Sequence, residues 1–342
     1  MAGLSDRVGS TAAPTPGDGS ERSDRAQLLL ITGLALAVIL VAVVLLLNTV
    51  IYTENLATRG VDVGGTEAAE LRSGTASDIE TLLARTDWST RDPDAFEADL
   101  AAYASTTREH RLRDGTVTRI GTETTDGSYI AQETVRELDP SEAHLDGTTT
   151  EPGDEWALVE GATRTRSYVL TDVSVTRQVE NGTVADDEAF RIMVESAGEE
   201  WTLYLYELTD QSSLTVRVNG ETKEFDDPER IDLTAGTVDG ERWDPLVWAE
   251  GVEDDPAESD NRTEYDISYA NGDAVNGTYE FVVDTRSGVK AGGSAEPLHD
   301  SAEGESPYAV DAVYDVNVTV GSHTPELRYE DTVRVAPGER GA

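Results

Sequence analysis

The chain has 342 residues, and its 68 acidic against 26 basic residues give a formal net charge of −42 at neutral pH. A charge of this sign repels polyanions, which excludes nucleic acid as a partner. Cysteine is absent, so disulfide bonds, thiolate metal sites, cysteine nucleophiles and a lipid-modified cysteine are excluded as well.

The first 27 residues are rich in Gly, Ser, Thr and Pro and lack hydrophobic periodicity. This composition predicts a disordered segment over residues 1–27, serving as a cytoplasmic tail or as a leader. No twin-arginine signal precedes the apolar run that follows.

An uncharged apolar run extends from Leu28 to Ile51. As a helix it would be about 36 Å long, enough to cross a hydrocarbon core of about 30 Å. Arg22 and Arg25 flank its N-terminal side, and basic residues near a membrane segment favour the cytoplasmic side. We therefore expect a single-pass transmembrane helix over residues 28–52, acting as a signal anchor, with the C-terminal domain extracellular.

Residues 53–114 are predicted to form a short helical stalk. Leucines and an isoleucine recur at roughly helical spacing between Thr66 and Thr86. A second helix is predicted from Pro93 to Arg113, because Asp92 suits the N-cap position and proline suits the first helical position.

From residue 115 to residue 337 the hydrophobic pattern has period two. Eight runs rich in β-branched and aromatic residues cover 167–177, 190–195, 200–207, 213–218, 264–269, 277–284, 310–320 and 327–335. Turns are predicted at Asn181-Gly182, Asn219-Gly220, Asn271-Gly272 and Asn276-Gly277. Alternation of apolar and polar residues implies strands with one buried and one solvent-exposed face. We therefore expect an antiparallel, sandwich-like β domain before a polar tail at 338–342. The expected fold class is α+β.

The charge is spread along the chain. Beyond residue 52 there are 23 basic and 64 acidic residues, a net charge of −41, and the whole chain has only two lysines. At 1 M salt the Debye length falls to about 3 Å, which screens such repulsion. This composition resembles that of proteins from halophilic archaea. An acidic, calcium-rich surface protein of a non-halophile is the alternative.

No group of residues identifies a reaction. The four histidines, at positions 110, 144, 299 and 323, are scattered, and no P-loop or G-x-S-x-G motif occurs. Two acidic clusters, Asp226-Asp227-x-Glu229 and Glu253-Asp254-Asp255, lack the spacing of a calcium loop. We expect no catalytic residue, no cofactor and no metal. A hydrolase whose serine nucleophile is assembled from distant residues remains an open alternative.

Four N-glycosylation sequons lie in the predicted extracellular part. Their asparagines are Asn181, Asn261, Asn276 and Asn317. Chance would give about one, given the Ser and Thr content, so four suggest N-linked glycans. The alternative is that threonine-rich strands create sequons without selection, and Asn317 is the weakest candidate because it falls within the predicted strand 310–320.

The sequence Ser23-Asp24-Arg25-Ala26-Gln27, followed at once by leucines, resembles the processing site of archaeal type IV prepilins. The resemblance implies that Arg25 and Ala26 end the leader and that Gln27 begins the mature chain. In addition, an apolar helix leading into an acidic β-rich domain resembles uncharacterised, pilin-like, single-pass surface proteins of haloarchaea. Ile31 replaces the glutamate that many bacterial pilins carry early in this helix.

These features predict a non-enzymatic, membrane-anchored cell-surface protein of a halophilic archaeon. An accessory pilin-like subunit is the more specific interpretation. The expected partners are the lipid bilayer, other pilin-like subunits and N-linked glycans. The alternative is an anchored ligand-binding or sensory module, in which exposed Trp243 and Trp248 line a pocket.

Overall fold

The structure, a computed structural model, describes residues 33–34, 36–41, 43–44, 65–113, 115–139, 155–180, 188–252, 263–285, 298–299, 307–324 and 327–340. The chain divides into two compact units, Met1–Gly64 and Gly65–Ala342. The described residues of the first unit are helical. Among all described residues, no helix combines the length and the apolar character needed to cross a bilayer.

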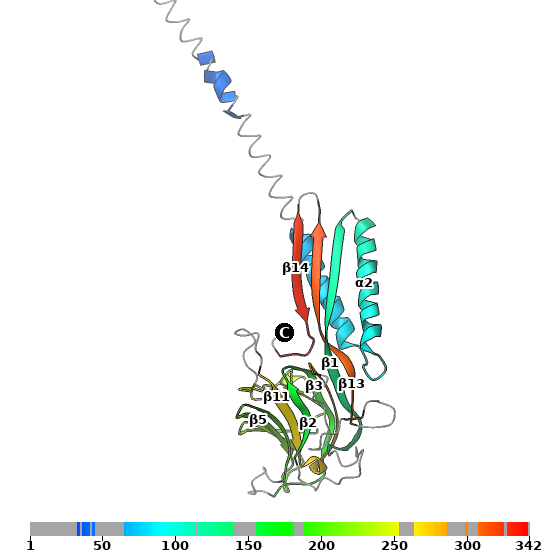
Figure 1. Cartoon of the computed structure of the whole chain (residues 1–342). Coiled ribbons are helices and arrows are strands. Elements are labelled where there is room, and N and C mark those ends of the chain that lie inside the picture. The colour runs from blue at the N-terminus through cyan, green and yellow to red at the C-terminus, as the bar shows by residue number, and fades with distance from the viewer. Residues whose placement is uncertain are drawn as a thin grey trace, which may run out of the picture. The chain divides into compact units, whose positions relative to one another are not determined.

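The second unit contains an eight-stranded antiparallel sheet with the order β10-β9-β8-β3-β12-β1-β13-β14. Its strands are β1 (Val117–Glu137), β3 (Thr165–Val175), β8 (Arg230–Asp232), β9 (Thr237–Val238), β10 (Glu241–Arg242), β12 (Val275–Val283), β13 (Tyr308–His323) and β14 (Arg328–Val335). Strands β1, β13 and β14 extend well beyond the others, together with the helices (Figure 1).

A six-stranded antiparallel sheet has the order β2-β11-β4-β5-β6-β7. Its strands are β2 (Glu155–Ala162), β4 (Phe190–Ser196), β5 (Glu199–Tyr206), β6 (Leu214–Val218), β7 (Glu221–Phe225) and β11 (Tyr265–Ala270), and a short 3₁₀ helix, η3 (Gly272–Ala274), precedes β12. Asn219 and Gly220 link β6 to β7 with φ of 48° and 88°. Positive φ at both central residues suits a tight hairpin turn, so the predicted turn is confirmed here.

The two sheets share one hydrophobic core, which we call the sandwich core. It includes Trp201 on β5, Tyr168 on β3 and Phe281 on β12. The Tyr168 and Phe281 rings stack with centroids 4.2 Å apart, and the Trp201 and Trp248 rings are 5.3 Å apart. Each large side chain buried here contributes about 1.5–3 kcal/mol to stability, so this core holds the sheets together.

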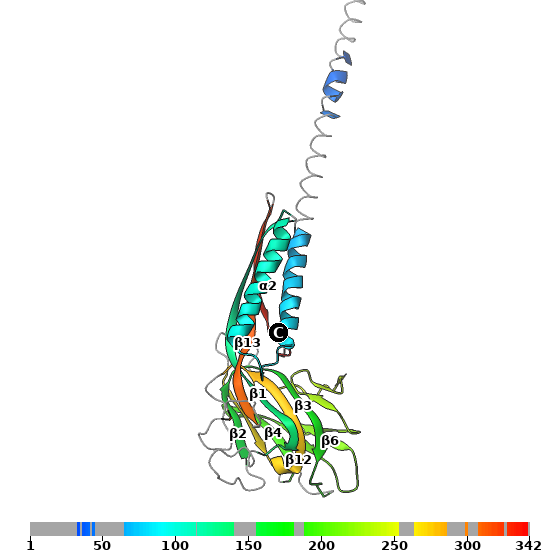
Figure 2. The ribbon, with the colours of Figure 1, turned by 90° about the vertical axis from the view of Figure 1, so that its right-hand side faces the viewer.

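Two antiparallel helices, residues 65–84 and α2 (Pro93–Arg113), lie beside the extended strands (Figure 2). The Tyr103 hydroxyl of α2 donates a 2.8 Å hydrogen bond to Asp78 of the first helix, which fixes their register. At the start of α2, the Ala95 amide donates a 2.7 Å hydrogen bond to the Asp92 carboxylate. The predicted bounds of α2 and its N-cap are therefore confirmed.

The helices cover a second hydrophobic core, which we call the helix-covered core. It joins Leu83 and Phe96 of the helices to Ile120 of β1 and Val318 of β13. Further along the same strand β1, Ile130 belongs to the sandwich core. The pairing of β1 with β13 shifts register between Thr125 and Asp126. Strand β1 therefore passes from one core to the other near this irregularity.

All eight predicted runs contain strands, namely β3, β4, β5, β6, β11, β12, β13 and β14. The predicted turn at Asn276-Gly277 is wrong, because both residues lie within β12. A Cβ on Gly277 would approach the Thr171 carbonyl oxygen of β3 to 3.3 Å. This glycine therefore allows a close approach of two strands, which a turn dipeptide in the sequence does not reveal.

The predicted α+β class with an N-terminal transmembrane helix is wrong for this structure. About 50% of the described residues lie in strands and 23% in helices, so the fold is mostly β, and no described helix suits a membrane span. The prediction underestimated the strand share, because it missed the 21-residue strand β1, whose threonines and glycines weaken the alternation, and several short strands. Most of the predicted span 28–52 lies outside the described residues.

Candidate functional site

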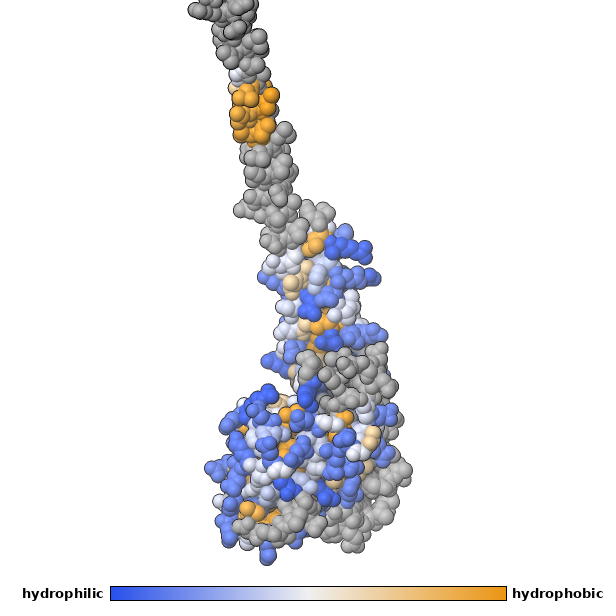
Figure 3. Space-filling model, turned by 90° about the vertical axis from the view of Figure 1, so that its left-hand side faces the viewer, coloured by the Kyte–Doolittle hydropathy of each residue, from blue (hydrophilic) through white to orange (hydrophobic). Residues whose placement is uncertain are grey.

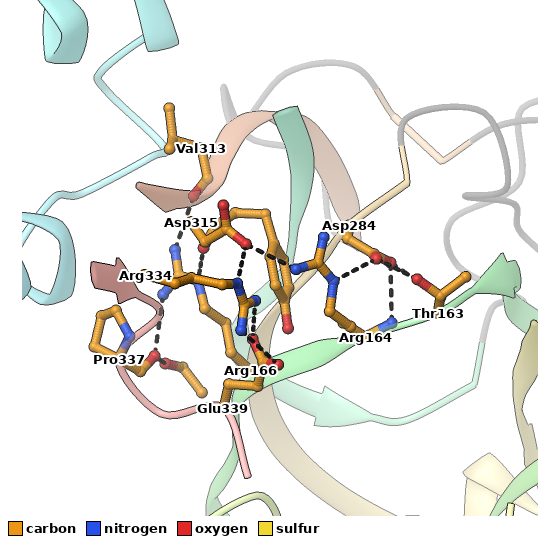
Figure 4. A network of polar contacts seen from close by, with 11 residues as sticks. Thr163, Arg164, Arg166, Asp284, Val313, Asp315, Arg334, Pro337 and Glu339 are labelled. Atoms are coloured by element: carbon orange, nitrogen blue, oxygen red, sulfur yellow. Dashed lines mark hydrogen bonds and ion pairs between the residues drawn. The ribbon is translucent and has the colours of Figure 1, made fainter. Parts of the chain in front are cut away.

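A network of charged side chains connects β3 and the turn before it to β13 and β14 (Figure 4). We call it the arginine network, and it consists of Arg164, Arg166, Asp284, Tyr314, Asp315, Arg334 and Glu339. These residues come from the β2–β3 turn, from β3, β13 and β14, and from the segments that follow β12 and β14. Chain segments distant in sequence therefore meet at one polar site.

Asp315 is the centre of the network, and it is only 1% exposed. One carboxylate oxygen accepts hydrogen bonds from Arg164 Nη1 at 2.8 Å and from Arg334 Nε at 2.5 Å. Arg334 also forms a two-pronged ion pair with Glu339. Arg164 extends the network to Asp284, with Nε 2.9 Å from Oδ2. Charge-assisted pairs of this kind are strong where water is excluded.

Arg166 is 2% exposed, and its hydrogen bonds go to backbone oxygens. Its Nε donates to the Tyr314 carbonyl at 2.8 Å, and its Nη2 donates to the Val313 carbonyl at 3.0 Å. Nη1 lies 3.5 Å from the Pro337 carbonyl. Burial lowers the pKa of Arg166 to about 10, so the side chain remains a cation at neutral pH.

The Tyr314 ring lies among three guanidinium groups. The Arg164, Arg166 and Arg334 guanidinium carbons lie 4.8, 5.8 and 5.9 Å from its centroid. These distances permit cation–π attraction. Burial raises the pKa of Tyr314 well above its ordinary value, so the phenol stays neutral at neutral pH.

Burial alone would raise the pKa of Asp315, but hydrogen bonds from Thr125 and Arg334 and the nearby Arg164 outweigh it and lower that pKa. Asp315 is therefore ionised at neutral pH, as its arginine partners are. None of the groups whose pKa shifts here titrates near neutrality. The arrangement suits permanent cross-linking of strands and does not suit proton transfer.

The network also holds the segment that follows β14. The Gly338 carbonyl accepts a 3.0 Å hydrogen bond from the Ser167 amide. Gly338 has a φ of +77°, and a Cβ there would lie 2.4 Å from Ser167 Oγ, so only glycine fits. Arg340 Nη1 then donates to the Trp248 carbonyl at 2.9 Å. The C-terminal segment is thus fixed to β3 and to the loop that contains Trp248.

A cavity of about 760 Å³, which we call the acidic hollow, opens at one end of the six-stranded sheet. Its carboxylates are Glu160, Glu195, Glu199, Glu200, Glu264 and Asp266, and none of the described residues lining it is basic. Burial raises the pKa of Glu195, and Glu155, Glu200 and Asp266 add to that rise. Within the described part of the chain, no group of acidic residues and histidines is arranged to hold a metal ion.

A smaller cavity of about 240 Å³ is lined by both Trp243 and Trp248, and we call it the tryptophan cavity. The expectation that both tryptophans are exposed is wrong. Trp248 is completely buried, and Trp243 is half-buried with its ring 6.0 Å from that of Phe225. Their apolar rings belong largely to the sandwich core, which explains the burial.

The structure does not bring the residues predicted as sites together. The processing residues Arg25, Ala26 and Gln27, the sequon asparagines Asn181 and Asn261, and the acidic cluster Glu253-Asp254-Asp255 lie outside the described residues. Asn276 lies in β12, half-buried and paired with Ser174 of β3. Asn317 lies in β13 between β1 and β14. Asn317 alternates with valines of the helix-covered core, which places it on the face away from the helices.

The sequence did not reveal the arginine network. The sequence feature that could have revealed it is a pair of arginines, Arg164 and Arg166, two positions apart at the start of an apolar strand in an otherwise acidic chain. A basic residue in such a strand needs a buried partner. The partners, however, lie more than a hundred residues further along the chain, at Asp284 and beyond.

The fold and its site thus define a mostly β protein with two cores joined by an ion network. Residues 22–144 match a family model described as "Family of unknown function (DUF7261)". The matched region includes the apolar run, both helices and β1. No curated protein and no solved structure matches the chain.

Proposed function

We propose that the protein is a non-enzymatic cell-surface protein of a halophilic archaeon, anchored in the cell membrane through the apolar segment 28–51. One observation carries this proposal. Large apolar side chains of the segment's described part are each more than half exposed: Leu34, Leu36, Val38, Ile39, Leu40, Val41, Val43 and Val44. Such a surface requires an apolar environment, which a lipid bilayer supplies.

The arginine network supports a non-enzymatic role. Its arginines and carboxylates pair with one another or with backbone carbonyls, as the contacts of Arg166 and Asp315 show. Groups held in this way stabilise the fold and are not poised to attack a substrate. The dispersed acidic charge supports a protein that works in concentrated salt.

Anchoring with the C-terminal unit outside the cell is tested by proteolysis of intact cells. Protease added to cells that express the full chain should remove Gly65–Ala342 and leave the apolar segment in the membrane fraction. Immunoblots with tags at both termini measure this result, and a cytoplasmic protein serves as the control for lysis. Protection in intact cells, with digestion only after lysis, would contradict the proposed orientation.

An accessory pilin-like subunit is the more specific proposal, and it rests on the resemblance at Arg25-Ala26-Gln27. Cleavage before Gln27 should give a mature chain that lacks the first 26 residues. Ala26→Arg places a bulky cation at the cleavage point and should leave the longer precursor, whereas Ala2→Arg, far from that point, should not. Mass spectrometry of the membrane fraction distinguishes the two forms. Peptides from residues 1–25 on the membrane-bound wild-type chain would reject processing.

An anchored ligand-binding module is the second candidate, because Trp243 and Trp248 do line one cavity. Ligand pockets usually enclose about 300–1,000 Å³, and the tryptophan cavity is smaller, so its ligand would have to be small. The anchored surface protein explains the exposed apolar segment as well, and it is the function we favour.

A further inference from the structure

Exposed apolar side chains of the second unit concentrate at one end of it. Among its described residues, three large apolar side chains are exposed: Leu112 by 51%, Val117 by 56% and Val135 by 51%. Leu112 belongs to the last turn of α2, and Val117 is the first residue of β1. Only a short turn around Gly115 separates them. Two of the three therefore lie close together in the chain, although Val117, which alternates with buried Thr118 and Ile120, lies on the face of β1 away from the helices.

The register of the elements shows which end this is. The helices are joined by the short connection 85–92 and run antiparallel, and the hydrogen bond from Tyr103 to Asp78 sets their register, so the C-terminus of α2 lies beside the start of the helix 65–84. Val117 pairs with His323 at the end of β13, and His323 pairs with Arg328 at the start of β14. We call this the hairpin end, formed by the first turn of helix 65–84, the last turn of α2, the start of β1 and the β13–β14 connection (Figure 2).

The hairpin end is far less acidic than the whole chain. Four arginines, at 108, 111, 113 and 119, offset Glu109 and Asp114 in the same stretch and Glu67 and Glu70 in the first turn of helix 65–84. Cations at the C-terminus of α2 also complement the helix dipole, but Arg119 lies on β1, outside that helix. The Arg113–Glu109 pair is 3.8 Å apart and largely exposed, so it neutralises these charges only weakly. Figure 3 shows apolar patches among hydrophilic side chains on the surface of the part of the second unit that encloses the helix-covered core.

Chain connectivity also singles out the hairpin end. Gly65, where the second unit begins, follows Ile51, the last residue of the apolar segment, by 14 positions. Even fully extended, such a connection spans at most about 50 Å. Val135 lies 18 residues beyond Val117 on the same strand, a distance of about 60 Å at 3.3 Å per residue. Leu112 and Val117 therefore lie at the end of the second unit where the chain from the apolar segment enters it, and Val135 lies far from that end.

We propose that the hairpin end docks on the lipid surface that anchors the chain, with Leu112 and Val117 in the headgroup region and the arginines beside lipid phosphates. This inference rests on the proposed membrane anchoring. Apolar side chains flanked by arginines are typical of protein segments that bind the lipid interface. The lipid phosphates attract the guanidinium groups, and the apolar side chains leave water. Among the described residues, the rest of the unit, with its large negative charge, offers no comparable group of basic residues beside an exposed apolar side chain to bind lipid phosphates.

The absence of cysteine makes the test direct. The full chain is reconstituted into vesicles of phosphatidylcholine and phosphatidylglycerol as Val117→Cys, Leu112→Cys or Val135→Cys, each labelled with an environment-sensitive fluorophore. Val135 is the matched control, because it is as exposed as Leu112 and lies on the same strand as Val117. Labels at 112 and 117 should emit at shorter wavelength and be quenched several-fold less by aqueous acrylamide than the label at 135.

The outcomes separate docking from anchoring. If the chain floats with the vesicles and the label at 117 is quenched like that at 135, docking is wrong and anchoring stands. If the chain does not float, anchoring is wrong and docking fails with it. Protection that grows with the protein-to-lipid ratio would identify a second copy of the chain as the occupant and overturn the lipid proposal. Circular dichroism of each variant shows that the β fold is retained.

Discussion

Replacing Arg166 with methionine should lower the free energy of unfolding of the second unit by about 3–5 kcal/mol. Methionine keeps much of the apolar volume but donates no hydrogen bond. The carbonyls of Val313 and Tyr314 would then be buried without their donors, and each unsatisfied group costs about 1–3 kcal/mol. Asp315 would also lose a nearby positive charge.

Denaturant unfolding at constant high salt, followed by circular dichroism, measures this loss. Arg242→Met is the matched control, because it removes an arginine whose side chain is 74% exposed and paired with Asp244, which is 90% exposed. Exposed ion pairs contribute only about 0–1 kcal/mol, so the control should be nearly neutral. Equal destabilisation by the two substitutions would show that the arginine network is not what holds the two cores together.

For Arg166, the sequence predicts the strand that carries it but not the groups that it contacts. The strand itself was predicted, because its run of aromatic and β-branched residues is typical of strands, and Tyr168 and Leu170 do face the sandwich core. The partners of Arg166 were not predictable, since the carbonyls that it contacts belong to β13 and to Pro337 after β14, and they become available only after the chain has folded. Local alternation specifies an element, whereas the register between distant strands depends on tertiary packing.

In the helical part, too, local features were predictable from the sequence and long-range packing was not. Asp92 and Pro93 identify the start of α2 because capping is a local interaction. That the helices cover β1 and β13 depends instead on Phe96 and Leu100 meeting valines more than two hundred residues away. Strand β1 was overlooked although it links both cores, since Thr, Gly and Asp interrupt its apolar pattern. The acidic hollow was equally hidden, because its carboxylates come from four strands, β2, β4, β5 and β11, and from the residue before β11.

Lowering the salt concentration should unfold the second unit without any denaturant. The chain beyond residue 52 has 64 acidic and 23 basic residues, a net charge of −41. The Debye length grows from about 3 Å at 1 M salt to about 30 Å at 0.01 M, so neighbouring carboxylates that are screened in the first case repel one another in the second. We therefore expect the β-type circular dichroism to disappear between these limits, and the melting temperature to fall steadily as salt is removed.

The acidic hollow should contribute strongly to this repulsion. Glu195 has a raised pKa there because burial and the carboxylates of Glu155, Glu200 and Asp266 disfavour its ionised form. Glu195→Gln removes one of these charges at nearly constant shape, so it should raise the melting temperature at low salt and have little effect at high salt. Glu109→Gln is the control, since Glu109 is 69% exposed and already lies near Arg113.

Replacing the salt with sucrose separates screening from solute exclusion, because an uncharged solute leaves the Debye length unchanged. A melting temperature that is the same from molar to millimolar salt would reject the halophilic interpretation, since unscreened repulsion among this many carboxylates must otherwise weaken the folded state.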